Sequence, residues 1–134
     1  MTDRHAARSY GMRAETLACL LLMAKGYRIM ARNYTIKGGE IDVIARRGQT
    51  IAFVEVKARP SFEQASFAIQ AQKVRRISLA ARVWLGRNPW AAGYTWRGDA
   101  VFIAPIMPFK AVSWRVSLQV SWPQHLIAAF ELAM

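Results

Sequence analysis

Cysteine is almost absent from this chain, because Cys19 is the single cysteine among its 134 residues. One cysteine excludes an intrachain disulfide, and a reducing compartment is the simplest interpretation, so we expect a cytoplasmic protein. Histidine is also scarce, and His5 and His125 do not form a metal-binding spacing. The sequence contains no P-loop, no dinucleotide-binding fingerprint and no Ser-His-Asp signature, so none of these common catalytic patterns applies.

Long hydrophobic runs are missing as well. The main apolar stretch, "TLACLLLMA" over 16–24, follows several arginines and in this respect resembles a signal peptide. Glu15 at its edge argues against that interpretation, and the following "KGYRIM" offers no small-x-small cleavage pattern. The run is also too short to span a bilayer. We therefore expect a core helix and no membrane span.

Acidic residues are few: eight Asp and Glu stand against nineteen Lys and Arg, which gives a formal charge of +11. Such an excess favours a polyanionic partner, either nucleic acid or an anionic membrane surface. Apolar residues make up 54% of the chain, so it should fold. The length suits a single domain over 1–134, and the polar residues 1 to about 8 are a candidate for disorder.

The pattern along the chain predicts one sheet flanked by helices, an α/β domain. The β-branched runs "EIDVIA" and "TIAFVEVKAR" flank the turn "RRGQ" and predict a hairpin near the centre of the sheet. The other expected elements are a helix over 9–25, a strand or extended connection over 27–36, a loop over 59–66, a helix over 68–86, strands over 99–106 and 111–120, and a short helix from about Pro123.

Three of the few carboxylates lie in that hairpin. Side chains alternate along a strand, so Glu40 and Asp42 share one face of the first strand. Glu55 and Lys57 share one face of the second. A turn over 46–49 would place Asp42 diagonal to Glu55, roughly 7–8 Å away, and a register shift of two would place them directly opposite. Such carboxylates need a metal, a basic partner or a proton.

Two residues of the expected helices are further candidates for the site in the hairpin. Glu15 lies on the apolar stripe of the first helix, and Lys73 lies on that of the second, where Gln72 precedes it. Each has an alternative role, because Glu15 could reach solvent or an arginine and Lys73 could extend to the surface. Arg75 and Arg76 suit contacts to a nucleic-acid backbone, although a solvated basic face explains them equally well.

These residues resemble a known family. "GMRAETLA", "GYRIMARNY", "GGEIDVIA", "FVEVKAR" and "QKVRRI" look like the YraN-like family of small bacterial proteins, whose function is uncharacterised. That family is grouped with the restriction-endonuclease-like, PD-(D/E)xK nucleases. The resemblance therefore implies a mixed central β-sheet flanked by α-helices.

The resemblance also implies a catalytic site. Asp42, Glu55 and Lys57 match the core catalytic pattern of the superfamily, and Glu15 matches a helical acid often found before it. The implied cofactor is Mg²⁺ or Mn²⁺, held by Asp42, Glu55 and the main-chain carbonyl of Val56. Glu40, Gln72 and Lys73 are accessory candidates. The basic residues expected to contact nucleic acid are Arg46, Arg47, Arg59, Lys73, Arg75 and Arg76.

Three functions stay open at this point. The first is a metal-dependent nuclease acting on DNA, favoured over RNA, with branched or damaged structures as candidate substrates. The second is a non-catalytic nucleic-acid-binding protein that retains the fold. The third is a structural or interaction protein with ion-paired strands. Tryptophans at 90, 96, 114 and 122 suit either a homodimer interface or the core.

Overall fold

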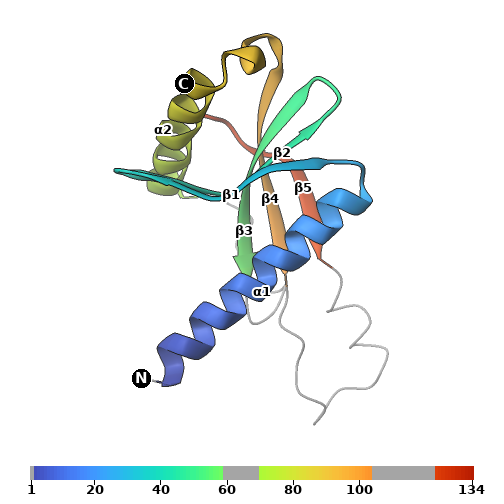
Figure 1. Ribbon diagram of the computed structural model, residues 1–134. Coiled ribbons are helices and arrows are strands. Elements are labelled where there is room, and N and C mark those ends of the chain that lie inside the picture. The colour runs from blue at the N-terminus through green and yellow to red at the C-terminus, as the bar shows by residue number, and fades with distance from the viewer. Residues whose placement is uncertain (1, 59–69, 104–122) are drawn as a thin grey trace.

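The computed structural model describes residues 2–58, 70–103 and 123–134, with side chains from residue 13 onward. This part of the chain forms one five-stranded sheet and two α-helices (Figure 1). In chain order the elements are α1 (Thr2–Ala24), β1 (Arg28–Ile36), β2 (Gly39–Arg47), β3 (Thr50–Ala58), α2 (Ala71–Arg87), the 3-10 helix η1 (Pro89–Gly93), β4 (Thr95–Ile103) and β5 (Gln124–Phe130).

The strands lie in the order β1-β2-β3-β4-β5. Only β3 and β4 run parallel, and α2 makes the crossover between them. The other neighbours are antiparallel, so the sheet is mixed and the β2–β3 hairpin lies at its centre. This confirms the expected α/β class and is consistent with a restriction-endonuclease-like fold.

Each helix covers one face of the sheet, and each face has its own core. Side chains on one side of β2 and β3 pack under α1, whose buried stripe consists of Ala14, Ala18, Cys19 and Leu22. Side chains on the other side pack under α2, and this second core contains Ile41, Ile44, Ile51, Phe53, Ile77, Ala80, Ala81, Trp84 and Ala91. The central strands are therefore buried on both faces, which explains their continuous apolar runs.

Several expected elements differ from the structure, including the strand expected at 99–106, which begins at Thr95. The first helix begins at Thr2 and not near Ser9, because its polar N-terminal residues continue the helical backbone. The segment after Pro123 is not a helix but the strand β5, which pairs with β4. A short apolar run such as "HLIAAF" has no distinctive period, so pairing with β4 decides its conformation. The expected loop at 59–66 and strand at 111–120 fall outside the described residues.

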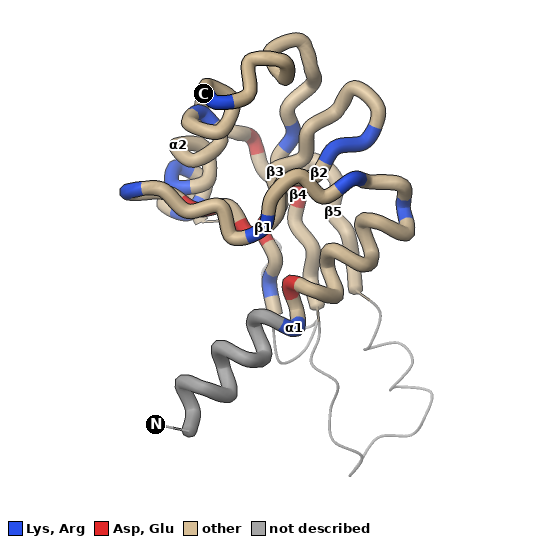
Figure 2. The backbone as a smooth tube through the Cα atoms, viewed as in Figure 1, with Lys and Arg blue, Asp and Glu red and all other residues tan. Residues whose placement is uncertain are grey.

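Figure 2 shows how charged positions are distributed along the described backbone. Most Asp and Glu positions lie near the middle of the fold, whereas most Lys and Arg positions lie toward its periphery. Among the residues that the structure describes, no helix combines the length and apolarity needed to cross a membrane.

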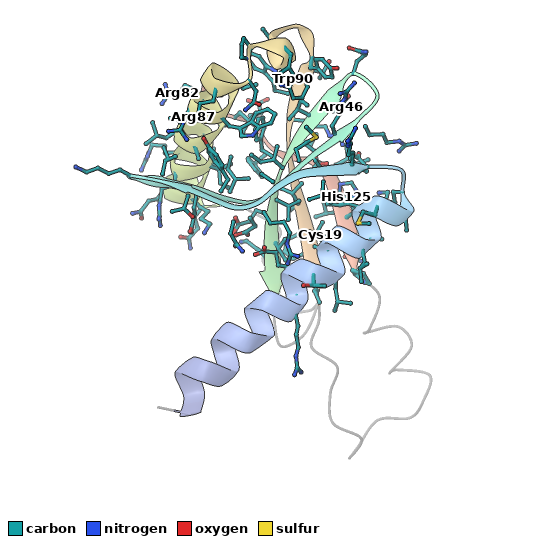
Figure 3. The ribbon with its side chains drawn as sticks, viewed as in Figure 1. Cys19, Arg46, Arg82, Arg87, Trp90 and His125 are labelled. Atoms are coloured by element: carbon teal, nitrogen blue, oxygen red, sulfur yellow. The ribbon has the colours of Figure 1, made fainter. Side chains whose placement is uncertain are left out.

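A buried ionic cluster joins β4 to β5. Asp99 is fully buried and accepts hydrogen bonds at 2.8 Å from both Nε and Nη2 of Arg97. His125 on β5, which lies toward α1 (Figure 3), donates to it through Nε2 at 2.8 Å. Lys25 contacts Nδ1 of the same ring, and the Ala128 N–H donates to Asp99 at 3.0 Å.

These donors determine the charge state of Asp99. Burial raises the pKa of Asp99, but hydrogen bonds from His125, Arg97 and the Ala128 N–H outweigh it and hold the pKa below its ordinary value. The carboxylate therefore stays ionised at neutral pH and anchors β5 to β4.

We predict that Asp99→Asn lowers the free energy of unfolding by about 3–5 kcal/mol, because Arg97 and His125 lose a buried charged partner. Urea denaturation followed by circular dichroism measures this difference. Glu131→Gln is the matched control, since Glu131 is exposed and should change stability by less than about 0.5 kcal/mol. A loss below about 1 kcal/mol for Asp99→Asn would show that the cluster does not anchor β5.

Candidate functional site

The register of the central hairpin brings Asp42 and Glu55 together. Ala45 pairs with Ala52 and Val43 pairs with Val54, so the expected pairing of Ala45 with Thr50 was wrong by two residues. The reason is a two-residue turn in which Gly48 has a φ of +59°, a conformation that glycine adopts readily. One further step in this register places Asp42 directly opposite Glu55, the alternative that the sequence had left open.

Both carboxylates lie where β2 and β3 begin to separate, because the regular pairing of the two strands ends at Val43 and Val54. The side chain of Asp42 replaces the missing ladder partner: its Oδ2 accepts a hydrogen bond of 2.8 Å from the Val56 N–H. Glu55 is only 6% exposed, and its Oε2 is buried without a hydrogen-bond partner. A buried carboxylate oxygen with no donor is costly, so this atom marks a place for a proton or a cation.

Lys73 approaches this pair from α2. Its Nζ lies 3.4 Å from Oε1 of Glu55 and 3.1 Å from Oε1 of Glu40. Burial lowers the pKa of Lys73, but the charges of Glu55 and Glu40 outweigh it and raise the pKa above its ordinary value. Lys73 therefore stays positively charged at neutral pH beside the carboxylates.

The close contact between β2 and α2 depends on Gly39. A Cβ at this position would lie 2.6 Å from the carbonyl oxygen of Arg76 and 3.1 Å from the backbone nitrogen of Ala80. Glycine thus lets the strand approach the helix backbone, and the next residue, Glu40, comes within reach of Lys73.

Glu15 reaches the site from α1, on the opposite side of the sheet from α2. It is 8% exposed, and Nε of Arg32 lies 3.4 Å from its Oε1. Burial and the negative charge of Asp42 raise the pKa of Glu15, whereas Arg32 lowers it. The repulsion by Asp42 shows that both carboxylates belong to the same electrostatic cluster. No sequence motif had marked Arg32 as a site residue. Its pairing with Glu15 follows only from the packing of β1 against α1.

Burial raises the pKa values of Asp42 and Glu55. Burial first, and then the charge of Asp42, raise the pKa of Glu55 to about 8. Burial also raises the pKa of Asp42, although the Val56 N–H counteracts this. Without a cation, the site therefore holds a proton on Glu55 at neutral pH. A divalent cation would favour the ionised form and displace that proton.

The donor set fits a hard cation such as Mg²⁺. Asp42 and Glu55 offer carboxylate oxygens, and Val56 lies beside Glu55 with a main-chain carbonyl. Within the described ranges, no group of three or more ligating side chains forms a ready metal site. Water and the Val56 carbonyl would therefore complete the coordination, as Mg²⁺ commonly keeps several waters.

Lys57 lies on β3, two positions beyond Glu55 and on the same face of the strand, and it is half-buried. The ion pairs with Glu40 and Glu55 described above come from Lys73 of α2. Lys57 and Lys73 thus belong to different elements, one to the sheet and one to α2.

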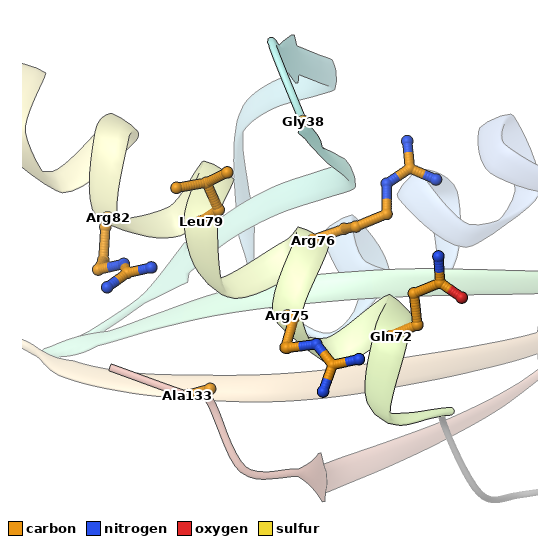
Figure 4. Close-up of a pocket in the computed structure, with 7 residues that line it drawn as sticks. All are labelled: Gly38, Gln72, Arg75, Arg76, Leu79, Arg82 and Ala133. Atoms are coloured by element: carbon orange, nitrogen blue, oxygen red, sulfur yellow. The ribbon is translucent and has the colours of Figure 1, made fainter.

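The expected basic residues divide into two groups. Arg75, Arg76 and Gln72 line a cavity of about 390 Å³ along α2, together with Gly38, Leu79, Arg82 and Ala133 (Figure 4). Arg46 and Arg47 lie at the other end of the hairpin, next to the turn. Arg59 falls outside the described residues. Only the residues of the first group therefore lie on α2, the helix that carries Lys73.

We predict that pH changes stability through Glu55. Its pKa of about 8 in the folded state exceeds the ordinary 4.5, so the folded protein binds more protons between these values. Stability should therefore fall as pH rises from about 4.5 to about 8 in the presence of a chelator.

Glu55→Gln should remove this part of the pH dependence and stabilise the chelated protein at pH 8 by at least about 1 kcal/mol. Urea denaturation at several pH values measures both effects, with the exposed Glu131→Gln as control. A wild-type stability that rises over this pH range, together with an unchanged slope in Glu55→Gln, would contradict the assignment.

Comparison with known proteins supports the resemblance noted above. Residues 14–103 match the family model described as "Uncharacterised protein family UPF0102". A UPF0102 protein of Methylocella silvestris is 55% identical over 130 residues, covering 97% of this chain and 94% of that protein. One from Methylobacterium nodulans is 50% identical over 129 residues, covering 96% and 89% respectively. The match confirms the YraN-like assignment, and these names state no activity.

Proposed function

The chain belongs to the uncharacterised protein family UPF0102, and we propose that it is a metal-dependent nuclease that hydrolyses DNA phosphodiester bonds. Branched or damaged DNA is the candidate substrate class. We further propose a cytoplasmic location, in keeping with the single cysteine.

One observation supports this proposal above the others. Asp42 and Glu55 converge at a buried point, and Oε2 of Glu55 has no partner there. A purely structural pair of carboxylates would be expected to have its oxygens satisfied, since two buried like charges destabilise a fold. A site in which Glu55 holds a proton until a cation displaces it explains why this arrangement is tolerated.

The proposed ligands of Mg²⁺ or Mn²⁺ are Asp42, Glu55 and the main-chain carbonyl of Val56. The bound ion would supply a water of lowered pKa and neutralise charge on the scissile phosphate. The Val56 N–H holds the Asp42 carboxylate in place, so this ligand is oriented before any ion binds.

The two lysines have separate roles in this proposal. Lys57 would orient the attacking water or stabilise the charge that develops on the phosphate in the transition state. Lys73 already holds Glu40 and Glu55, so its role is to orient the Glu55 carboxylate. Glu15 would act through a bound water, in line with its position near Asp42.

The surrounding arginines provide the affinity for DNA. The net charge of +11 attracts phosphates, and Arg75, Arg76 and Arg82 line one cavity beside α2. The carboxylates alone would repel a phosphate, so the proposed cation would also convert this repulsion into attraction.

A second function, nucleic-acid binding without catalysis, has one observation in its favour. Lys73 lies 3.4 Å from Oε1 of Glu55 and so neutralises part of the site without any metal. In that case the carboxylates would serve the fold, and only the basic surface would act. The cleavage assay below separates these two functions.

We predict that Asp42→Asn and Glu55→Gln abolish Mg²⁺- or Mn²⁺-dependent cleavage, because each removes a ligand charge but keeps the side-chain shape. Lys57→Ala should keep the metal and lose about 10²–10³-fold in rate. Cleavage of linear, single-stranded and branched DNA measures activity, and circular dichroism checks folding.

A second measurement separates metal binding from rate. Mn²⁺ should raise the melting temperature of the wild type and of Lys57→Ala, but not that of Asp42→Asn. If the wild type cuts none of the substrates, binding without catalysis becomes the better proposal. If Asp42→Asn cuts as fast as the wild type, the site is wrongly assigned.

We also predict that DNA affinity falls steeply with salt, because phosphate contacts release counterions. Replacing both Arg75 and Arg76 by Gln should reduce the slope of log K against log salt by about 2. Arg13→Gln is the control, since Arg13 is exposed on α1, on the opposite side of the sheet. A flat salt response in the wild type would reject nucleic acid as the partner.

A further inference from the structure

An exposed aromatic cluster lies at the turn end of the β2–β3 hairpin, away from the carboxylates. Trp90 of η1 keeps 44% of its surface exposed. The guanidinium of Arg46 lies over two rings, 5.5 Å from the centroid of Trp90 and 4.9 Å from that of Tyr94. Figure 3 shows Arg46 and Trp90 near each other at this end of the sheet. We call Arg46, Trp90 and Tyr94 the aromatic platform.

The platform is held in place by the core beneath it. Trp90 packs edge-on against the buried Trp84 at 5.8 Å and against Tyr94 at 5.4 Å. Trp84 in turn packs against Phe53 in the centre of the sheet. The indole N–H of Trp90 donates to Oδ1 of Asn88 at 3.3 Å. A large exposed ring with this much support is pre-organised to bind a flat partner.

Positive charge lies close to the platform. Arg46 pairs with Arg28 across β1 and β2, and Arg47, the last residue of β2, lies over the ring of Tyr27 on the other side of the strand. Within the described part of the chain, no salt bridge joins these three arginines to a carboxylate. An exposed indole and a half-buried phenol ring next to Arg46 and Arg28 suit a ligand that is both flat and anionic.

The platform is also close enough to the carboxylates to share one ligand with them. Arg46 and Asp42 both lie on β2, and a rise of about 3.3 Å per residue separates them by about 13 Å along the strand. Single-stranded nucleic acid typically occupies about 4–16 nucleotides on a binding domain, which is enough to span this distance.

We propose that Arg46, Trp90 and Tyr94 bind unpaired bases by stacking, so that the DNA beside the carboxylate site is single-stranded at this end. Bases in a duplex turn only their edges outward and cannot cover an indole ring, whereas unpaired bases can stack on it. This inference rests on the proposed function, since it specifies the form of the nucleic acid.

Trp96 provides a contrast within the same region. It is 39% exposed, but it lines a separate cavity together with Glu131, and its indole N–H donates to the Ala91 carbonyl. A carboxylate beside the ring disfavours a phosphate backbone there. Trp96 is therefore a matched control for an exposed tryptophan outside the platform.

The test is fluorescence anisotropy with a labelled oligothymidylate about 16 nucleotides long and a duplex of the same length, in chelator so that no cleavage occurs. Trp90→Ala should weaken oligothymidylate binding about tenfold and leave duplex binding unchanged. Trp90→Phe should restore most of the affinity, and Trp96→Ala should have no effect. Arg46→Lys, which keeps the charge but loses the flat guanidinium, should weaken only the single strand.

Several outcomes would overturn the inference while leaving the proposed function intact. These are duplex binding without single-strand binding in the wild type, an equal loss for both probes in Trp90→Ala, no loss for either probe, or an equal loss in Trp96→Ala. A change of molecular mass in solution in Trp90→Ala, with DNA affinity unchanged, would assign the platform to contact with a second copy. If folded wild-type protein binds neither probe, the proposed function fails and the inference fails with it.

Discussion

The placement of the half-buried Asp42 carboxylate opposite the buried Glu55 is the constraint on which the centre of this structure depends. Asp42 and Glu55 face each other where β2 and β3 part, and burial raises both of their pKa values. The Val56 N–H and the Lys73 ammonium offset part of the cost, but Oε2 of Glu55 stays without a donor. A proton on Glu55 satisfies this oxygen up to about pH 8, and a bound cation would displace that proton.

The neighbouring elements are arranged around that pair. Gly39 lets β2 approach the backbone of α2, which brings Glu40 and Lys73 into contact. On the other side of the sheet, α1 presents Glu15, and Arg32 of β1 holds it by an ion pair. Elements from both layers therefore meet at one point of the central hairpin, although each contributes only one or two side chains.

The basic exterior and the acidic centre have complementary consequences. Arginines along α2 and at the hairpin turn attract a polyanion without distinguishing its form. The carboxylates would repel that polyanion unless a cation lies between them and the phosphate. The aromatic platform adds what charge alone cannot provide, since a ring surface distinguishes unpaired bases from a duplex.

The sequence by itself determined the α/β class, the central hairpin and the faces of its strands. Alternating side chains in "EIDVIA" and "TIAFVEVKAR" are a local property, so the shared faces of Glu40 with Asp42 and of Glu55 with Lys57 could be predicted from them, whereas the family resemblance singled out the candidate catalytic residues. Tertiary structure decided the rest. The register depended on a two-residue turn at Gly48, and β5 became a strand because β4 offered it an edge. The partners Lys73, Arg32 and His125 are distant in sequence from the carboxylates they contact, and only packing of the helices and strands brings such residues together.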